Sequence, residues 1–203
     1  MLYTQNYLNT QCDFERPHQS IYTHLSERQV NMVGVEVTDV LELTEEQAKL
    51  VQRHIPAITM LMAYYRKFGE QALNVAREWA FRSGKRRGED AKRRMNLVGT
   101  DARAMEALFN SILPERYDEE TIRKKLTRIS TEKNRTISVS EGFCPVMAAV
   151  KMLNAPWNIV CENYSVPFHL GLASAINPRV KGELPKARWK GDECCQHIAV
   201  IEE

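Results

Sequence analysis

The chain has 203 residues, of which 43% are hydrophobic and 27% charged, and its formal net charge is +2. These values are typical of a globular domain that buries its own core, and they exclude a wholly disordered chain. The small net charge argues against nucleic acid as a main partner, and no apolar run approaches the roughly 20 residues that a membrane span requires.

The N-terminus lacks the basic and apolar regions of a signal peptide. Five cysteines, four of them in the last 60 residues, do not form the pattern of a secreted disulfide framework and predict reduced thiols in the cytoplasm. We expect residues 1–43 to form an extended arm, in which the alternating valines of 31–43 indicate a short strand or connector. Residues 44–203 are expected to form a single α+β domain, with a helical part at 44–114 and a sheet-containing part at 115–203.

The helical part begins with a capping box at Thr44–Gln47, which is followed by apolar residues at three- and four-residue steps. Pro56 should kink or break this helix near His54. Further helices are expected over residues 69–81, ended by Gly84 and Gly88, and over 90–113, stopped by Pro114. The second is either continuous or broken at Gly99.

A basic run extends from Arg82 to Arg94 and holds seven positive and two negative side chains. It could contact phosphate or nucleic acid, but no aromatic residues interleave with the charges. We therefore interpret the run as the solvated end of one helix and the start of the next, with Gly84 and Gly88 between them.

The sheet-containing part predicts an antiparallel sheet of about four strands with two inserted helices. β-Branched residues favour a hairpin over 121–129 and 135–140, and a second hairpin over 184–189 and 194–201. Cys144-Pro145 should open a helix through Leu153, because a proline in the first turn loses no hydrogen bond. A second helix is expected from Pro156 to about Ala175.

The chemistry is expected to lie in the last third of the chain. Alternation along the final strand puts Cys195 and His197 on one face, about 7 Å apart, where a metal ion, a water or a substrate could join them. Cys194 points to the opposite face and is interpreted as a packing residue.

Helical spacing offers a second thiol–imidazole pair, because His169 follows Cys161 by about two turns. Two cysteines and two histidines could bind zinc in principle, but the close spacings typical of zinc sites are missing, so no metal or other cofactor is predicted. Cys144 is either a nucleophile, favoured by the helix start that follows it, or a buried turn residue.

The order of these motifs resembles the L-2-amino-thiazoline-4-carboxylic acid hydrolase family. The resemblance covers about Thr44 to Ile201. It rests on Cys144-Pro145, the helix with Cys161, Ile176-Asn177-Pro178, and the turn Gly191-Asp192-Glu193-Cys194-Cys195. The segment from Tyr65 and the spacing of Gly84 and Gly88 also look like the family.

The resemblance implies hydrolysis of a non-peptide C–N bond, such as ring opening of a cyclic amidine by a thiolate. The catalytic residues implied are Cys161, Cys195, His197 and Asp192, with His197 as the base and Asp192 or Glu162 orienting it. Arg179 or Arg188 would hold a substrate carboxylate. The substrate-binding residues implied are Cys144, Glu162, Tyr164, His169, Asn177, Arg188 and Cys194.

Two other interpretations stay open. The Gly-Asp-x-Cys-Cys turn before a terminal strand also looks like the 4-vinyl-reductase type of domain, which would bind a small molecule or a metal without turning it over. A third interpretation is a partner protein whose helices 44–113 form the interface of a homo-oligomer. A wide exposed apolar stripe on those helices would favour this last interpretation.

Overall fold

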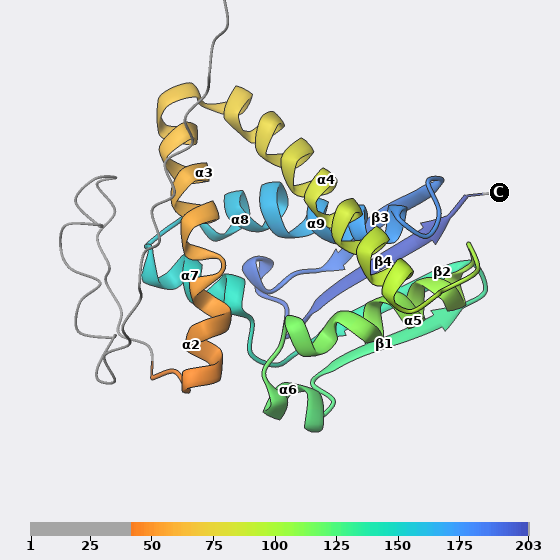
Figure 1. Cartoon of the computed structure of the whole chain (residues 1–203). Helices are drawn as coiled ribbons and strands as arrows, with labels where there is room; N and C mark the ends of the chain where they lie inside the picture. The colour runs from red at the N-terminus through yellow and green to blue at the C-terminus, as the bar shows by residue number, and fades with distance from the viewer. Residues whose placement is uncertain (1–41, 203) are drawn as a thin grey trace, which may run out of the picture.

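The computed structural model describes residues 42–202, and its order of elements confirms the predicted α+β class (Figure 1). Helices occupy the N-terminal half, and a four-stranded antiparallel sheet follows with helices between its strands. Residues 1–41 of the expected arm lie outside the described residues. No helix within 42–202 has both the length and the apolar character needed to cross a membrane.

The first two helices follow the sequence signals. Helix α2 (Glu45–Gln52) begins at Thr44, whose hydroxyl accepts from the Gln47 N–H while the Gln47 side chain accepts from the Thr44 N–H, as the capping box predicts. Helix α3 (Ile55–Phe68) begins directly after His54 with Pro56 in its first turn, so the expected break at this proline is confirmed.

Helix α4 (Glu70–Arg94) is a single long helix, and the predicted end at Gly84 and Gly88 is wrong. Both glycines are buried where α9 crosses α4 (Figure 1). A Cβ atom at Gly84 would lie 2.1 Å from the Phe168 carbonyl oxygen, and one at Gly171 of α9 would lie 2.1 Å from the Phe81 carbonyl oxygen. The glycines therefore permit close contact of two backbones, and they do not stop the helix.

The segment 90–113 is not one helix, and the alternative with a break at Gly99 is confirmed: the chain leaves α4 at Met95 and starts α5 (Ala102–Ile112) after Asp101. Asp101 caps α5 by accepting from the Ala104 N–H at 2.8 Å. The short helices η2 (Leu113–Glu115) and α6 (Glu119–Arg123) follow. Helix α6 replaces the first part of the expected strand over 121–129, because Asp118 caps it through the Thr121 N–H.

The sheet has the strand order β1-β2-β4-β3 with antiparallel neighbours. Its strands are β1 (Thr127–Glu132), β2 (Arg135–Ser140), β3 (Val180–Lys186) and β4 (Cys195–Ile201). Strand β3 starts and ends earlier than the predicted 184–189. The chain turns instead through η4 (Arg188–Lys190), because the Asp192 carboxylate accepts from the Ala187 N–H at 2.7 Å and holds the turn.

Helix α7 (Pro145–Met152) opens at Cys144 as predicted. The helix expected from Pro156 to Ala175 comprises α8 (Trp157–Val160), a π-helical turn η3 (Cys161–Ser165) and α9 (Val166–Ser174). In the π turn the Val166 N–H donates to the Cys161 carbonyl, five residues back. Pro167 in the first turn of α9 has no N–H to donate, which accounts for the wider turn at this point.

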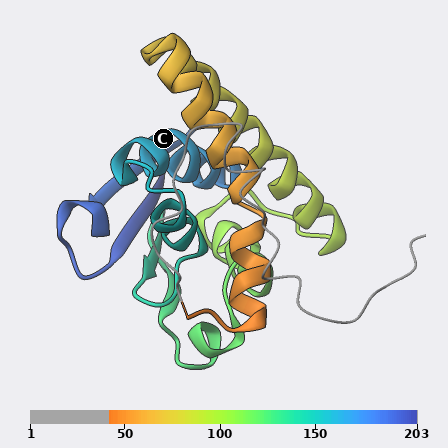
Figure 2. The same cartoon turned by 90° about the vertical axis from the view of Figure 1, so that its left-hand side faces the viewer.

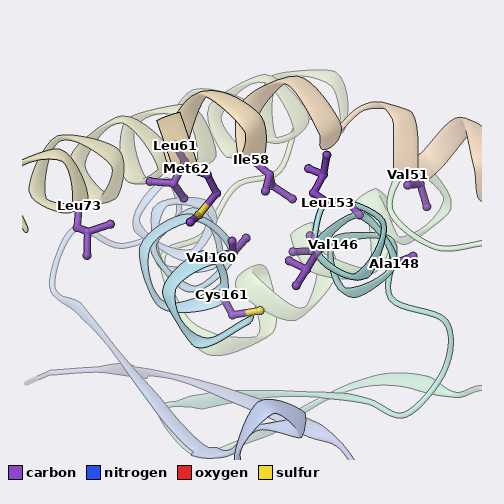
Figure 3. Close-up of a cluster of buried hydrophobic side chains, with 12 residues drawn as sticks. Val51, Ile58, Leu61, Met62, Leu73, Val146, Ala148, Leu153, Val160 and Cys161 are labelled. Carbon is purple, nitrogen blue, oxygen red and sulfur yellow. The ribbon is translucent and has the colours of Figure 1, made fainter. Parts of the chain in front are cut away.

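Two clusters of buried side chains hold the elements together. One lies between α3, α7 and the α8–η3 segment, and Figure 3 shows Cys161 on its side toward the strands. The other joins α5 and α9 to the sheet around Met105, Leu108 and Leu172. The sulfur of Cys161 thus lies at the boundary between the helical core and the sheet, where a pocket is found.

Candidate functional site

A small pocket of about 50 Å³ lies where the start of β4 and the end of β2 meet the helices α7, η3 and α9. It brings together Cys144, Cys161, His169, Arg188, Cys195 and His197, all predicted as site residues. The remaining lining residues are His54, Arg116, Tyr117, Ser138, Ser140, Pro145, Val146, Trp157, Ser165, Val166 and Trp189.

The sheet register supplies one wall of this pocket. Ser138 lies opposite His197 and Ser140 lies opposite Cys195, so these four side chains share one face of the β2–β4 pair. The expectation that Cys195 and His197 share a face is met by this register. Cys194 precedes β4, is partly buried, and is not among the residues that line the pocket.

Three cysteines reach the pocket from separate elements. The Cys144 sulfur caps α7 by accepting from the Met147 N–H at 3.5 Å, and the Cys195 sulfur accepts from the Arg188 N–H at 3.5 Å. Burial raises the pKa values of the Cys144 and Cys161 thiols above their ordinary value, and the neighbouring cysteines add to the rise for Cys161. Both groups are therefore protonated thiols near neutral pH.

Two histidines form the opposite part of the site. The rings of His169 and His197 stack with centroids 4.3 Å apart, and the Arg116 guanidinium donates to His169 Nε2 at 2.7 Å. Burial, and then the Arg116 charge, lowers the pKa of His197 to about 4 and that of His169 well below its ordinary value. Both imidazoles are neutral near pH 7, and Arg116 supplies the positive charge beside them.

His54 and Arg116 are among the lining residues that were not predicted as site residues. His54 Nδ1 lies 2.9 Å from the Tyr164 hydroxyl. The pKa of His54 is lowered to about 4, mainly because the ring is buried. The available signal for His54 was its position two residues before Pro56, where the proline was expected to break the helix next to the core. Arg116 lies 53 residues from His169 in the sequence, and no local pattern indicates their contact.

Four further predicted site residues do not line the pocket. Asp192 holds the η4 turn through Ala187 and is not among the residues that line the pocket with His197. Asn177 donates to the Thr100 carbonyl at 2.9 Å, and Glu162 is exposed. Tyr164 lies outside the pocket lining but supports it through its bond to His54.

Two hydrogen-bond donors in the pocket wall have no partner within the described part of the chain. They are Nε of Arg188 and Nε1 of Trp189, and both atoms are buried. The same guanidinium donates through Nη1 to the Gly142 carbonyl at 3.0 Å, which holds its orientation. A buried donor without an acceptor costs about 1–3 kcal/mol. An acceptor placed beside either N–H group would offset this cost.

A second cavity of about 90 Å³ adjoins the first and shares Ser138, Val166, His169 and His197 with it. Its other walls are mostly apolar and come from α5, α9, β3 and β4, with Phe109, Leu170 and Leu184 among them. The stacked imidazoles therefore separate a polar pocket from a more apolar one. Within residues 42–202, no three His, Cys, Asp or Glu side chains are arranged to hold a metal ion.

Comparison with known proteins places few constraints on this chain. No protein-family model matches the sequence, and no curated protein matches it. One similar solved structure is the crystal structure of a trafficking protein particle complex subunit 3 from Naegleria fowleri, covalently bound to palmitic acid. It is 12% identical, with a TM-score of 0.49 over 77% of this chain and 97% of that one. A similarity of this size identifies neither a family nor a function for the present chain.

Proposed function

We propose that this chain is a small-molecule-binding domain, without catalytic turnover, whose pocket holds a small anion such as a carboxylate. The observation that carries this proposal is the pair of buried N–H groups on Arg188 and Trp189 that lack an acceptor. A carboxylate accepts two hydrogen bonds from a guanidinium and an indole without needing a proton of its own.

The charge in the pocket supports an anionic ligand. Arg116 and Arg188 contribute two permanent positive charges, and neither forms an ion pair with a carboxylate of the described residues. The thiols of Cys144 and Cys161 and the imidazole of His197 are neutral near pH 7, because burial disfavours their charged forms. An anion would therefore meet two cations and no Asp or Glu carboxylate among the lining residues.

The volume limits the size of the ligand. One water molecule needs about 10–15 Å³ of cavity volume, so a cavity of about 50 Å³ has space for roughly four water-sized groups. Formate, acetate and propionate have this size. A ligand with more atoms would have to extend into the adjoining apolar cavity or displace side chains.

The test is thermal unfolding of the full chain with acetate and with uncharged acetamide. Acetate at 100 times its dissociation constant should stabilise the fold by about 2.7 kcal/mol. For a domain of this size, that raises Tm by about 5–10 °C. Acetamide should give a clearly smaller shift, because it lacks the charge.

The variant Trp189→Phe removes the indole N–H and should reduce the acetate shift to less than half. Trp79→Phe is the matched control, because Trp79 is exposed on α4 and does not line the pocket. Equal shifts with acetate and acetamide, or an undiminished acetate shift in Trp189→Phe, would overturn the proposal.

Hydrolysis of a C–N bond is a second candidate, and the position of Cys144 favours it. Its sulfur accepts a backbone N–H at the start of α7, where a helix stabilises an anion. Catalysis requires a thiolate, and burial opposes that state. Native alkylation with iodoacetamide at pH 7.5 separates the two candidates. Fast labelling that Cys144→Ser abolishes would support a nucleophile, whereas labelling slower than that of the unfolded chain would support binding alone.

A further inference from the structure

The pocket contains two arginine side chains and no acidic one. Arg116 and Arg188 line it, and no Asp, Glu or Lys is among the lining residues. In the described part of the chain, one more charged side chain, that of Arg53, acts on a lining group, namely His54, and it adds positive charge. Since a guanidinium stays ionised in proteins, the pocket carries two permanent positive charges and no nearby carboxylate.

The two guanidinium groups are fixed toward different ends of the pocket. The Arg188 N–H donates to the Cys195 sulfur at 3.5 Å, and the Arg188 guanidinium donates to the backbone just beyond the end of β2. Arg116 donates to His169, whose ring stacks on that of His197. Cys195 and His197 are two residues apart on one face of β4, so about 7 Å separates them. The two cations are thus held beside successive positions of that face.

The two arginines also come from different parts of the fold. Arg188 belongs to η4, in the turn between β3 and β4, whereas Arg116 directly follows η2, between α5 and α6. In Figure 2 the blue turn lies at the left edge of the molecule, and the green segment between α5 and α6 lies nearer its centre. An anion that pairs with one arginine is therefore not placed beside the other by the same contact.

A single carboxylate leaves one of these cations without a counter-ion. Bound at the unpaired N–H groups of Arg188 and Trp189, it would neutralise Arg188. Arg116 would then keep the imidazole of His169 and two aromatic rings, whose centroids lie 5.8 and 5.6 Å from its Cζ. These partners are neutral, and a partly buried charge without an opposite charge is costly.

We propose, building on the anion-binding function proposed above, that the ligand of this pocket is a short dicarboxylate such as malonate. One carboxylate pairs with Arg188, and the other pairs with Arg116. The second carboxylate lies at the polar side chains that line both cavities, which are Ser138, His169 and His197. The ligand thereby brings one negative charge to each arginine.

The volume and the walls limit the length of the dicarboxylate. The first cavity of about 50 Å³ has no space for a long chain between the two carboxylates. A longer chain would carry the second charge into the adjoining cavity, among the apolar side chains of Phe109, Leu170 and Leu184. Burying a charge against such groups is unfavourable, so malonate should bind better than succinate.

The positions of the charges disfavour other small ligands. An amino acid would bring an ammonium group into a pocket that already holds two cations, and like charges repel each other. A sulfate or phosphate ion carries its charge on one centre, which suits one guanidinium better than two that are held apart. A dicarboxylate separates its two charges, as the two arginines do.

Thermal unfolding of the full chain at pH 7.5 and constant ionic strength tests the second carboxylate. The probes are malonate and malonamate, in which an amide replaces one carboxylate at nearly the same size. The dependence of Tm on ligand concentration gives each dissociation constant. Malonate should bind at least tenfold more tightly than malonamate or acetate, because it alone of the three neutralises both arginines. Succinate should bind more weakly than malonate.

Variants of the chain locate the second charge. Arg116→Gln should weaken malonate binding at least tenfold while acetate binding changes less than about threefold, because acetate needs Arg188 alone. Arg116→Lys retains the positive charge and should keep most of the preference for malonate. Arg103→Gln is the matched control, because Arg103 is exposed on α5 and does not line the pocket. If Arg116→Gln does not fold, the comparison of malonate with malonamate in the unaltered chain decides.

The outcomes separate this inference from the proposed function. Equal affinities for malonate and malonamate, with acetate still more stabilising than acetamide, refute the dicarboxylate and leave a monocarboxylate site in place. Tighter binding of sulfate than of malonate contradicts two separate charges. Equal losses of malonate affinity in Arg116→Gln and Arg103→Gln exclude a specific pair with Arg116. If neither acetate nor malonate raises Tm, the anion-binding function is itself wrong, and this inference fails with it.

Discussion

Gly84→Ala tests the closest contact between two helices in this fold. The new Cβ atom would lie 2.1 Å from the Phe168 carbonyl oxygen and 2.9 Å from the Phe168 carbonyl carbon. An ordinary carbon–oxygen contact is about 3.3 Å, so α4 and α9 would have to separate by about 1 Å. Backbone atoms meet the methyl group, and no side-chain rotation can relieve the clash.

The cost follows from three contributions. Overpacking of this kind destabilises a protein by about 1–3 kcal/mol, and a backbone clash belongs at the upper end. Moving α4 and α9 apart would open a gap between them. A gap of 0.5–1 Å removes about a quarter to a half of the dispersion energy of the contacts that it separates. The higher helix propensity of alanine offsets about 1 kcal/mol of this destabilisation. The expected net loss is about 2–3 kcal/mol.

The assay is thermal or urea unfolding of the full chain. A loss of this size lowers Tm by about 4–12 °C in a domain of this length. Gly182→Ala is the matched control, because its Cβ atom would meet only the end of the flexible Leu170 side chain at 3.3 Å. If Gly84→Ala melts at or above the temperature of the unaltered chain, the backbones of α4 and α9 are not in close contact at this position.

Two further predictions concern acid and a helix cap. Because the pKa of His197 falls from 6.5 to about 4 on folding, the unfolded chain binds more protons between these values, so stability is full above pH 6.5 and falls as the pH drops toward 4. Urea midpoints should show a loss of up to about 1.4 kcal/mol per pH unit for this histidine, and His197→Gln should have a shallower slope; equal slopes would contradict this. Asp101→Ala should lower the free energy of unfolding by about 1 kcal/mol, because the Ala104 N–H loses its cap, while Asp101→Asn should retain most of it; equal losses in both would exclude a capping role.

Local signals in the sequence were sufficient for much of the fold. The capping box at Thr44, the proline at position 56 and the Cys144-Pro145 pair each determine a helix start through groups within four residues of each other. Strand β2 has the predicted bounds, because β-branched residues fill it. Alternation along β4 likewise placed Cys195 and His197 on one face.

Contacts between distant segments decided the rest. Gly84 has the same local signature as a glycine that ends a helix, and only the crossing of α9 distinguishes the two roles. Asp192 was expected beside His197, but its carboxylate accepts a hydrogen bond from the Ala187 N–H in the turn that precedes β4. Arg116 reaches His169 across 53 residues, and Nε of Arg188 and Nε1 of Trp189 are buried atoms without an acceptor.

The sequence by itself therefore determined the α+β class, several helix starts and the thiols and imidazoles that the pocket would contain. These depend on hydrogen bonds and periodicities that extend over a few residues. The tertiary structure alone decided the ionisation of Cys144, Cys161, His169 and His197 and the burial of the unpaired donors on Arg188 and Trp189. Burial and the neighbouring guanidinium determine that ionisation, and they arise only when segments far apart in the chain come together.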